Sequence, residues 1–244
     1  MIWNIALRTA ATVLIAYLIG GINPAIIITK MKTGEDIRKM GSGNAGFTNV
    51  LRSVGKGPAI ATIVCDYLKG IIAVLIGWWI FSSMSVTNGV APLEYAKYGR
   101  YLAGVFVILG HSFPIYFGFK GGKGVVTANA LMLVVDFRVF LMIIATFLII
   151  FFCTKLISLG SISCAILYPV YTLFVTYFFD YLPLLGTENE LRFRFVLIST
   201  GCALIVGTMV VAMHRANIHR LLSGTEKKIK AKDSSKEQNT SAAE

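Results

Sequence analysis

Seven apolar segments dominate this chain and constrain its fold more than any other feature. A transmembrane helix needs roughly 20 apolar residues to cross the hydrocarbon core, and a helix satisfies its own backbone polar groups there. Hydrophobic residues make up 56% of the chain and charged residues only 14%, which is too little charge to cover a soluble domain. We therefore predict an all-α integral membrane protein. The predicted spans are residues 5–29, 57–81, 99–117, 125–135, 139–153, 161–182 and 193–213.

The basic residues predict how these spans are oriented. Six Lys or Arg residues lie between Lys30 and Lys56, and seven more follow Met213. The 82–98 loop carries little charge, and the 183–194 loop is acidic in its centre. Because cytoplasmic loops are enriched in Lys and Arg, we predict an N-terminus outside and a C-terminus in the cytoplasm. The net charge of +11 is then mainly topological, and no alternation of basic and aromatic residues indicates nucleic-acid binding.

The segment 125–153 is ambiguous, because it fits either one long helix or two helices hinged at Asp136 and Arg138. One helix gives six crossings and places the basic tail outside, whereas two helices give seven and keep both basic regions in the cytoplasm. We favour seven, although the first helix of the pair is short for a span. We expect the membrane domain to cover residues 1–226, and 227–244 to form a disordered, basic to polar cytoplasmic tail.

The cysteines indicate neither a disulfide framework nor a metal site. All four lie in apolar stretches, and no CxxC or Cys/His spacing of a zinc site accompanies them. We interpret Cys65, Cys153, Cys164 and Cys202 as buried packing residues. We expect no metal and no cofactor, since no cluster of carboxylates lies among the polar motifs either.

Three polar, glycine-containing stretches interrupt the apolar chain, at 41–52, 110–124 and 214–226, and on the seven-span topology all three face the cytoplasm. Each alone is typical of a turn, a positive anchor or a headgroup contact. Together they combine glycines that expose backbone N–H groups, lysine charge and an arginine fork, which are the groups that bind phosphate. ATP is disfavoured, because Gly124 replaces the Ser or Thr of a P-loop.

These motifs resemble the PlsY family of bacterial acyl-phosphate:glycerol-3-phosphate acyltransferases, over roughly residues 17–226. The matching motifs are Ser42-Gly43-Asn44-x-Gly46-x-Thr48-Asn49-Val50-x-Arg52, Asp66-x-Leu68-Lys69-Gly70, Gly110-His111-x-Phe113-Pro114, Phe119-Lys120-Gly121-Gly122-Lys123-Gly124-Val125, Ser158-Leu159-Gly160 and His214-Arg215-x-Asn217-Ile218. The chain departs from the family at Phe47, Val126 and Ala216, and Phe47 puts the acyl-chain preference in doubt.

The resemblance implies a seven-helix enzyme of the bacterial cytoplasmic (inner) membrane, with its active site on the cytoplasmic side. The family transfers an acyl group from acyl phosphate to the sn-1 hydroxyl of glycerol 3-phosphate. The products are lysophosphatidic acid and inorganic phosphate, and the reaction is the first acylation of phospholipid biosynthesis. The expected partners are these substrates and membrane lipid, not nucleic acid. The enzyme that produces acyl phosphate is a candidate protein partner.

We assign catalytic roles to Arg52 and Lys120 as clamps on phosphate oxygens. Further catalytic donors are Ser42, His214 and Asn217. The candidate substrate-binding residues are Gly43, Asn44, Thr48, Asn49, Gly121, Gly122, Lys123, Gly124 and Ser158, and the candidate structural residues are Asp66, Lys69 and Glu226. Among the binding candidates, Asn44, Thr48 and Asn49 are favoured as braces of their loop over substrate contacts. For His111, packing near a helix end is favoured over binding.

Acyl phosphate is already activated, so the enzyme has to orient two anions and stabilise charge at the carbonyl and leaving group. In the family the donor phosphate is proposed to accept the hydroxyl proton, which agrees with the absence of an HxxxxD motif here. General-base catalysis by His214 remains an alternative. The rival classes are a membrane transporter of an organic phosphate, which predicts inverted repeats and a midplane site, and a non-catalytic lipid-binding or scaffold protein.

Overall fold

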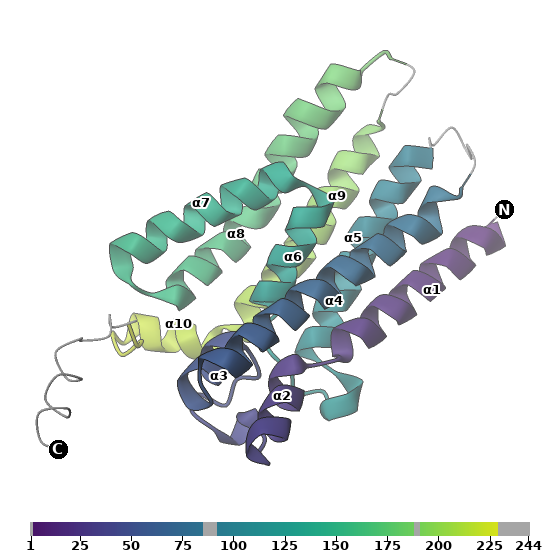
Figure 1. Ribbon diagram of the computed structural model, residues 1–244. Helices are drawn as coiled ribbons and strands as arrows, with labels where there is room; N and C mark the ends of the chain where they lie inside the picture. The colour runs from purple at the N-terminus through teal and green to yellow at the C-terminus, as the bar shows by residue number, and fades with distance from the viewer. Residues whose placement is uncertain (1, 85–91, 188–190, 229–244) are drawn as a thin grey trace, which may run out of the picture.

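The computed structural model describes residues 2–84, 92–187 and 191–228, and within these ranges the chain is helical without a strand. The α-helices are α1 Ile2–Gly21, α2 Pro24–Thr33, α3 Phe47–Ser53, α4 Lys56–Ser82, α5 Pro92–Ser112, α6 Val125–Val135, α7 Phe137–Thr154, α8 Ile157–Val175, α9 Phe193–Met213 and α10 Arg215–Leu222 (Figure 1). Short 3-10 turns cover Ile37–Lys39, Ile115–Phe117 and Leu182–Leu184, and a π-helical segment covers Thr176–Tyr181.

Six helical stretches of the described residues are long and apolar enough to cross a membrane. They are Asn4–Thr33, Lys56–Ser82, Pro92–Phe117, Phe137–Thr154, Ile157–Leu184 and Phe193–Met213. The remaining predicted span, 125–135, is the shorter helix α6, with 11 residues. The all-α membrane fold expected from the apolar pattern is confirmed, and the seven-crossing topology stays a proposal.

The first predicted span, 5–29, lies within one membrane-spanning stretch, Asn4–Thr33, which is broken into two helices. Helix α1 ends at Gly21 and α2 begins at Pro24. The Asn23 side chain accepts a hydrogen bond from the Ile26 amide at 3.2 Å, and Pro24 stands at the first helical position, where its missing N–H costs no hydrogen bond. The break exposes the Ile22 carbonyl, which accepts a hydrogen bond from Lys69 Nζ at 2.8 Å.

The predicted hinge near Asp136 is confirmed. Helix α6 ends at Val135, α7 begins at Phe137, and the Asp136 carboxylate accepts a hydrogen bond from the Arg138 amide at 3.0 Å. Asp136 therefore caps α7 and separates the two helices. Other expectations fall outside the described residues, namely the acidic centre of the 183–194 loop (188–190) and the tail from 229 onward. The domain boundary at 226 stays a prediction.

Small residues bring the long helices into backbone contact. A Cβ atom built on Gly77 of α4 would overlap the Gly99 carbonyl oxygen of α5, and one on Gly207 of α9 would overlap the Ala165 carbonyl oxygen of α8. Close approach of this kind is how membrane helices gain packing energy, since lipid provides no hydrophobic drive between them. As a result α1, α4 and α5 form one tight unit, with α8 and α9 packed beside it (Figure 1).

The outward faces of these helices are apolar, as a lipid-facing surface requires. Trp79, Ile149 and Phe152 are 70%, 65% and 63% exposed, respectively. Two cysteines share this surface, because Cys65 and Cys153 are exposed, whereas Cys164 is buried and Cys202 half-buried. The prediction of four buried thiols was therefore wrong for two of them, since in a membrane protein an apolar sequence context does not distinguish the bundle interior from the lipid face.

Candidate active site

A cavity of about 980 Å³ opens at the end of the bundle where α2, α3 and α10 gather (Figure 1). Its walls come from all three polar segments of the sequence and from the start of α8. Its polar lining includes Ser42, Gly43, Asn44, Thr48, Asn49, Arg52, Asp66, His111, Lys123, Gly124, Ser158, His214, Asn217, Arg220 and Glu226. Segments separated by more than a hundred residues in sequence thus meet in one site, as their shared chemistry predicted.

The first polar segment is held in shape by Asn49. The buried side-chain amide of Asn49 donates hydrogen bonds to the carbonyls of Ile37, Met40 and Asn44, at 3.2, 3.0 and 3.0 Å. Its Oδ1 atom accepts a hydrogen bond from the Ser42 amide at 3.0 Å. These contacts use the polar atoms of Asn49 within the loop, so the bracing role favoured from the sequence describes it better than substrate binding.

The braced loop presents Ser42 and Arg52 to the cavity. Arg52 is exposed, and its guanidinium has no hydrogen bond or ion pair with any described residue. It sits in the last turn of α3, and its five donors are available to a ligand. An uncommitted guanidinium at a cavity wall is well suited to bind phosphate oxygens in a bidentate manner.

The glycine-rich segment differs from the prediction. Lys120 is exposed and is not part of the cavity lining, and neither are Gly121 and Gly122. A Cβ atom on Gly121 would overlap the His111 carbonyl oxygen, and one on Gly122 would overlap the His111 ring. These two glycines therefore allow the loop to pack against the end of α5, and of residues 119–124 only Lys123 and Gly124 line the cavity.

The course of this loop explains why Lys120 does not line the cavity. Arg38, which is ion-paired with Asp36 at 2.7 Å, donates hydrogen bonds to the carbonyls of Phe117 and Lys120, at 2.7 and 3.1 Å. Gly118 and Phe119 adopt left-handed backbone conformations, with φ of 64° and 58°. After this turn Lys120 is exposed outside the cavity lining, and Lys123 is part of it.

Glu226 organises the third polar segment. Its Oε1 atom accepts hydrogen bonds from Ser158 Oγ at 2.7 Å and from Asn217 Nδ2 at 2.8 Å. Its Oε2 atom pairs with Arg220 Nε at 2.6 Å. The pKa of Glu226 lies below its usual value, because hydrogen bonds from Ser158, Arg220 and Asn217 outweigh its desolvation, the largest single effect. The Glu226 carboxylate thus holds three cavity-lining side chains, Ser158, Asn217 and Arg220, which is the kind of structural role predicted for it.

Lys123 and His214 complete the polar part of the cavity lining, which we call the polar mouth. Lys123 Nζ donates a hydrogen bond to Asn217 Oδ1, which joins the glycine-rich loop to α10. Burial, together with the positive charge of Arg220, lowers the pKa of Lys123 to about 8 despite the opposing effect of Glu226. The Lys123 amine is therefore still mostly protonated at neutral pH, and an added anion would raise its pKa.

His214 lies buried at the junction of α9 and α10, where its Nδ1 atom is 2.7 Å from the Val210 carbonyl oxygen. A carbonyl accepts a proton and donates none, so Nδ1 carries the hydrogen and Nε2 is an acceptor in the neutral ring. Burial lowers the pKa of His214 to about 4, against the raising effect of this hydrogen bond. A neutral imidazole of such low basicity is a poor general base for a hydroxyl group.

Asp66, Lys69 and His111 form a buried charged cluster beneath the polar mouth. Lys69 Nζ lies 2.8 Å from Asp66 Oδ1 and 2.8 Å from His111 Nδ1, and His111 Nδ1 lies 3.4 Å from Asp66 Oδ1. All three side chains are buried, so the expected pairing of Asp66 with Lys69 inside the bundle is confirmed. The cluster supports the glycine-rich loop through the His111 carbonyl, which accepts a hydrogen bond from the Gly122 amide at 3.2 Å.

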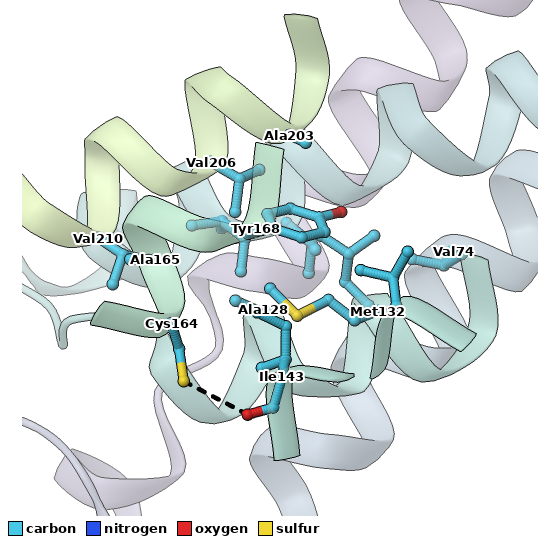
Figure 2. Packing of buried hydrophobic residues seen from close by; sticks show 14 of the residues in the cluster. Val74, Ala128, Met132, Ile143, Cys164, Ala165, Tyr168, Ala203, Val206 and Val210 are labelled. Atoms are coloured by element: carbon cyan, nitrogen blue, oxygen red, sulfur yellow. Dashed lines mark hydrogen bonds between the residues drawn. The ribbon is translucent and has the colours of Figure 1, made fainter. Parts of the chain in front are cut away.

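The interior of the same cavity is apolar. Its deeper walls come from α6, α7, α8 and α9, and Figure 2 shows several of the side chains that pack there around Tyr168. The labelled residues that line the cavity are Ala128, Met132, Ile143, Cys164, Ala165, Tyr168, Val206 and Val210. A polar mouth joined to an apolar interior is suited to an amphipathic ligand with a charged head and a hydrocarbon chain.

Two features of the site were not predicted from the sequence. Arg220 lines the cavity, and it follows His214 and Asn217 at intervals of three residues, a helical spacing that places all three on one face of α10. His111 belongs to the Asp66 and Lys69 cluster, although a helix-terminal packing role was favoured for it. The sequence carries no signal for that contact, because His111 lies on α5 and its partners lie on α4.

Comparison with known proteins shows the family of this chain. The family model described as glycerol-3-phosphate acyltransferase matches residues 10–224. The glycerol-3-phosphate acyltransferase of Shouchella clausii is 40% identical over 221 residues, covering 90% of this chain and 95% of that protein. The protein of the same name from Clostridioides difficile is 38% identical over 215 residues, covering 88% and 92%, respectively.

Two solved structures have the same fold. Both are crystal structures of PlsY (YgiH), an integral membrane glycerol 3-phosphate acyltransferase. Its glycerol 3-phosphate form has a TM-score of 0.69 at 32% identity and covers 91% of this chain and 96% of that one. Its lysophosphatidic acid form has a TM-score of 0.67 at 30% identity, with coverage of 91% and 95%. On the family match and these identities, the chain belongs to the glycerol-3-phosphate acyltransferase family.

Proposed function

We propose that this protein transfers a fatty acyl group from acyl phosphate to the sn-1 hydroxyl of glycerol 3-phosphate, releasing lysophosphatidic acid and inorganic phosphate. The observation that carries the proposal is the single cavity of about 980 Å³, in which a phosphate-binding mouth continues into an apolar interior. The mouth provides donors for two phosphate groups, and the interior provides room for an acyl chain. Family membership and the glycerol 3-phosphate form of the PlsY structure support the acceptor.

In the proposed reaction the sn-1 oxygen attacks the carbonyl carbon of the mixed anhydride. The bond between that carbon and the bridging phosphate oxygen breaks, and the departing phosphate takes the hydroxyl proton. No protein base is then required. This agrees with His214, whose pKa of about 4 and whose Nδ1 contact with the Val210 carbonyl leave a weakly basic Nε2. Its proposed role is to orient a hydroxyl or a protonated phosphate oxygen.

The two proposed phosphate clamps are Arg52 and Lys123. Arg52 is uncommitted at one wall of the mouth, and Lys123 stands in the lining with Asn217 as its partner. Lys120, to which the sequence assigned this role, lies outside the lining. We propose that Ser42 and Asn217 add neutral donors, that Ser158, whose hydroxyl hydrogen goes to Glu226, accepts a hydrogen bond from a glycerol hydroxyl, and that Gly43 and Gly124 allow backbone N–H groups to approach an anion.

The decisive experiment measures phosphate release from palmitoyl phosphate and glycerol 3-phosphate by the purified protein. Arg52→Ala and Lys123→Ala should each lower kcat/KM by at least about 100-fold, since each removes a charged hydrogen bond to a reacting group. Lys120→Ala is the matched control and should retain most of the activity. Palmitoyl-CoA should not replace palmitoyl phosphate. No release by the wild-type protein, or equal loss in Lys120→Ala and Lys123→Ala, would refute this assignment.

We further propose that the protein lies in the bacterial cytoplasmic membrane with seven crossings, its N-terminus outside and its active site and C-terminus in the cytoplasm. The six long helices together with α6 give an odd number of crossings, which keeps both basic regions on one side. Helix α6 has 11 residues and is about 17 Å long. It can serve as a crossing because the preceding glycine-rich loop enters the bundle and packs against buried His111.

A further inference from the structure

A second cavity, of about 380 Å³, lies in the other half of the bundle, where α6 passes into α7. It is lined by Lys97, Arg100, Tyr101, Leu133, Val134, Val135, Asp136, Phe137, Arg138, Asp180 and Phe195. Lys97 and Arg100 belong to the first half of α5, whereas the active-site end of α5 is its last turn. This cavity shares no lining residue with the proposed active site, and its interpretation does not depend on the proposed reaction.

The charges in this cavity do not balance. Three cations face two carboxylates, Asp136 and Asp180, among the lining residues. Arg138 uses both carboxylates, through Nη2 contacts of 2.5 Å with Asp136 Oδ2 and 2.8 Å with Asp180 Oδ1. Lys97 Nζ is 3.9 Å from Asp180 Oδ2, at the limit of an ion pair. One positive charge therefore has no counter-charge among the lining residues.

The unmatched cation is Arg100. Its Nη1 atom donates a hydrogen bond of 3.3 Å to the Val134 carbonyl, its guanidinium lies over the Trp78 ring, and its buried Nε atom has no partner. No carboxylate of the described residues forms an ion pair with it. A buried donor without a partner and a half-buried charge without a counterion are both costly, and an anion in the cavity would compensate the charge.

The walls indicate which kind of anion fits. Leu133 and Phe137 line the cavity and are also 38% and 61% exposed, so the cavity opens onto the apolar outer surface of the bundle. Trp79, 70% exposed and next to Trp78, marks this level as the interface between hydrocarbon and headgroups, where tryptophan is enriched. The volume suits a phosphodiester headgroup and is too small for acyl chains, which have room along the exposed apolar residues outside.

We propose that this cavity binds the phosphodiester headgroup of an anionic phospholipid, with Arg100 as the principal ligand to phosphate and Lys97 as the second. The lipid chains lie against Leu133 and Phe137. The bound phosphate neutralises the unmatched charge of Arg100. On the proposed topology, this is a lipid of the outer leaflet, bound in the leaflet opposite the active site.

The test measures lipid binding to the purified full-length protein by native mass spectrometry and by the rise in its unfolding temperature. Phosphatidylglycerol should bind at least about ten-fold more tightly than phosphatidylcholine with the same chains, because only its headgroup carries net negative charge. R100Q should weaken phosphatidylglycerol binding by about ten-fold, the effect of losing one charge-assisted hydrogen bond at a half-buried site. R100K should retain most of the affinity, since it keeps the charge.

Two controls separate this site from general charge effects. Arg8 lies in the same half of the bundle and donates hydrogen bonds to Asn4 and Ser83, so Arg8→Gln should leave lipid binding unchanged. Arg52→Ala, in the active-site mouth, should also leave it unchanged. If R100Q fails to fold, Leu133→Trp provides a second variant, because it blocks the opening without removing charge and should lower the affinity equally.

Three outcomes would overturn the proposal. The first is equal phosphatidylglycerol binding by the wild-type protein and R100Q, or by the wild-type protein and Leu133→Trp. The second is equal binding of phosphatidylcholine and phosphatidylglycerol. The third is equally tight binding of glycerophosphoglycerol, the same headgroup without acyl chains, which would assign the cavity to a free phosphate ester instead of a lipid.

Discussion

Lys123 provides a quantitative prediction about the pH dependence of the reaction. Its pKa in the empty site is lowered to about 8 by burial and by Arg220. A phosphate anion bound beside it favours the protonated amine, so binding raises this pKa and takes up protons. Substrate capture by the free enzyme should therefore be strongest below pH 8 and should weaken as the pH rises through 8.

The size of the effect follows from the fraction of Lys123 that is protonated. With a pKa of about 8, this fraction is about 0.9 at pH 7 and about 0.1 at pH 9, so kcat/KM should fall by about ten-fold over that interval. The substrates do not contribute a comparable change, because the second pKa of a phosphate monoester is about 6 and the monoester is a dianion throughout.

The assay is phosphate release from palmitoyl phosphate and glycerol 3-phosphate between pH 7 and pH 9.5, corrected for spontaneous hydrolysis at each pH. Lys123→Arg is the matched variant, since a guanidinium stays charged over this range. Its absolute kcat/KM differs because its shape differs, but its profile should stay flat where the wild-type profile falls. The same alkaline decline in both proteins, or no decline in the wild-type protein, would refute the role of Lys123.

Three further predictions concern the supports of the site and the bundle. Glu226→Ala frees Ser158, Asn217 and Arg220 together, and should lower kcat/KM by about 100-fold with little change in Tm. Glu226→Gln should lose less activity than Glu226→Ala. A drop in Tm that matches the lost activity would indicate unfolding instead of a misplaced site. Lys69→Met leaves the buried Asp66 carboxylate without its Lys69 partner, and should destabilise the protein by about 3–5 kcal/mol in detergent unfolding. The double variant Asp66→Asn/Lys69→Met should recover part of that loss, and equal stability of the single and double variants would contradict the pairing. Gly77→Ala should lower Tm because its Cβ atom meets the Gly99 carbonyl, whereas Gly201→Ala, with open space around it, is the control and should not.

An apolar sequence context identifies a membrane helix but does not show which of its residues face lipid and which face the interior. Long apolar runs identified the helices, because each helix satisfies its own backbone in lipid. The same runs gave no distinction between Cys153, which is exposed, and Cys164, which is buried. Likewise, the break at Asn23 was missed because its apolar flanks continue on both sides, although an Asn followed by Pro is a helix-start signal.

Most of the polar residues that line the cavity could be named from the sequence motifs, but the sequence did not show which of two neighbouring lysines lines it. Arg52, His214, Asn217 and Ser158 were all identified by residue type and motif, and all line one cavity. Only the structure shows that Lys123, and not Lys120, lines the cavity. The two lysines are three residues apart in the same motif, and the turn of the loop decides which one reaches the cavity. That turn depends on Arg38, which lies some 80 residues earlier and donates to the Lys120 carbonyl.

The sequence by itself determined that the chain is a helical membrane protein interrupted by polar, glycine-containing motifs, since hydropathy and residue chemistry are local properties of the chain. Only the tertiary structure decided which charges are satisfied by neighbours and which remain available. Asp66 and Lys69 neutralise each other in the interior, and Glu226 commits Arg220, whereas Arg52 and Arg100 keep donors free at the walls of two separate cavities. The reason is physical: the cost of a charge in a low-dielectric bundle is set by groups that are distant in sequence and adjacent in space.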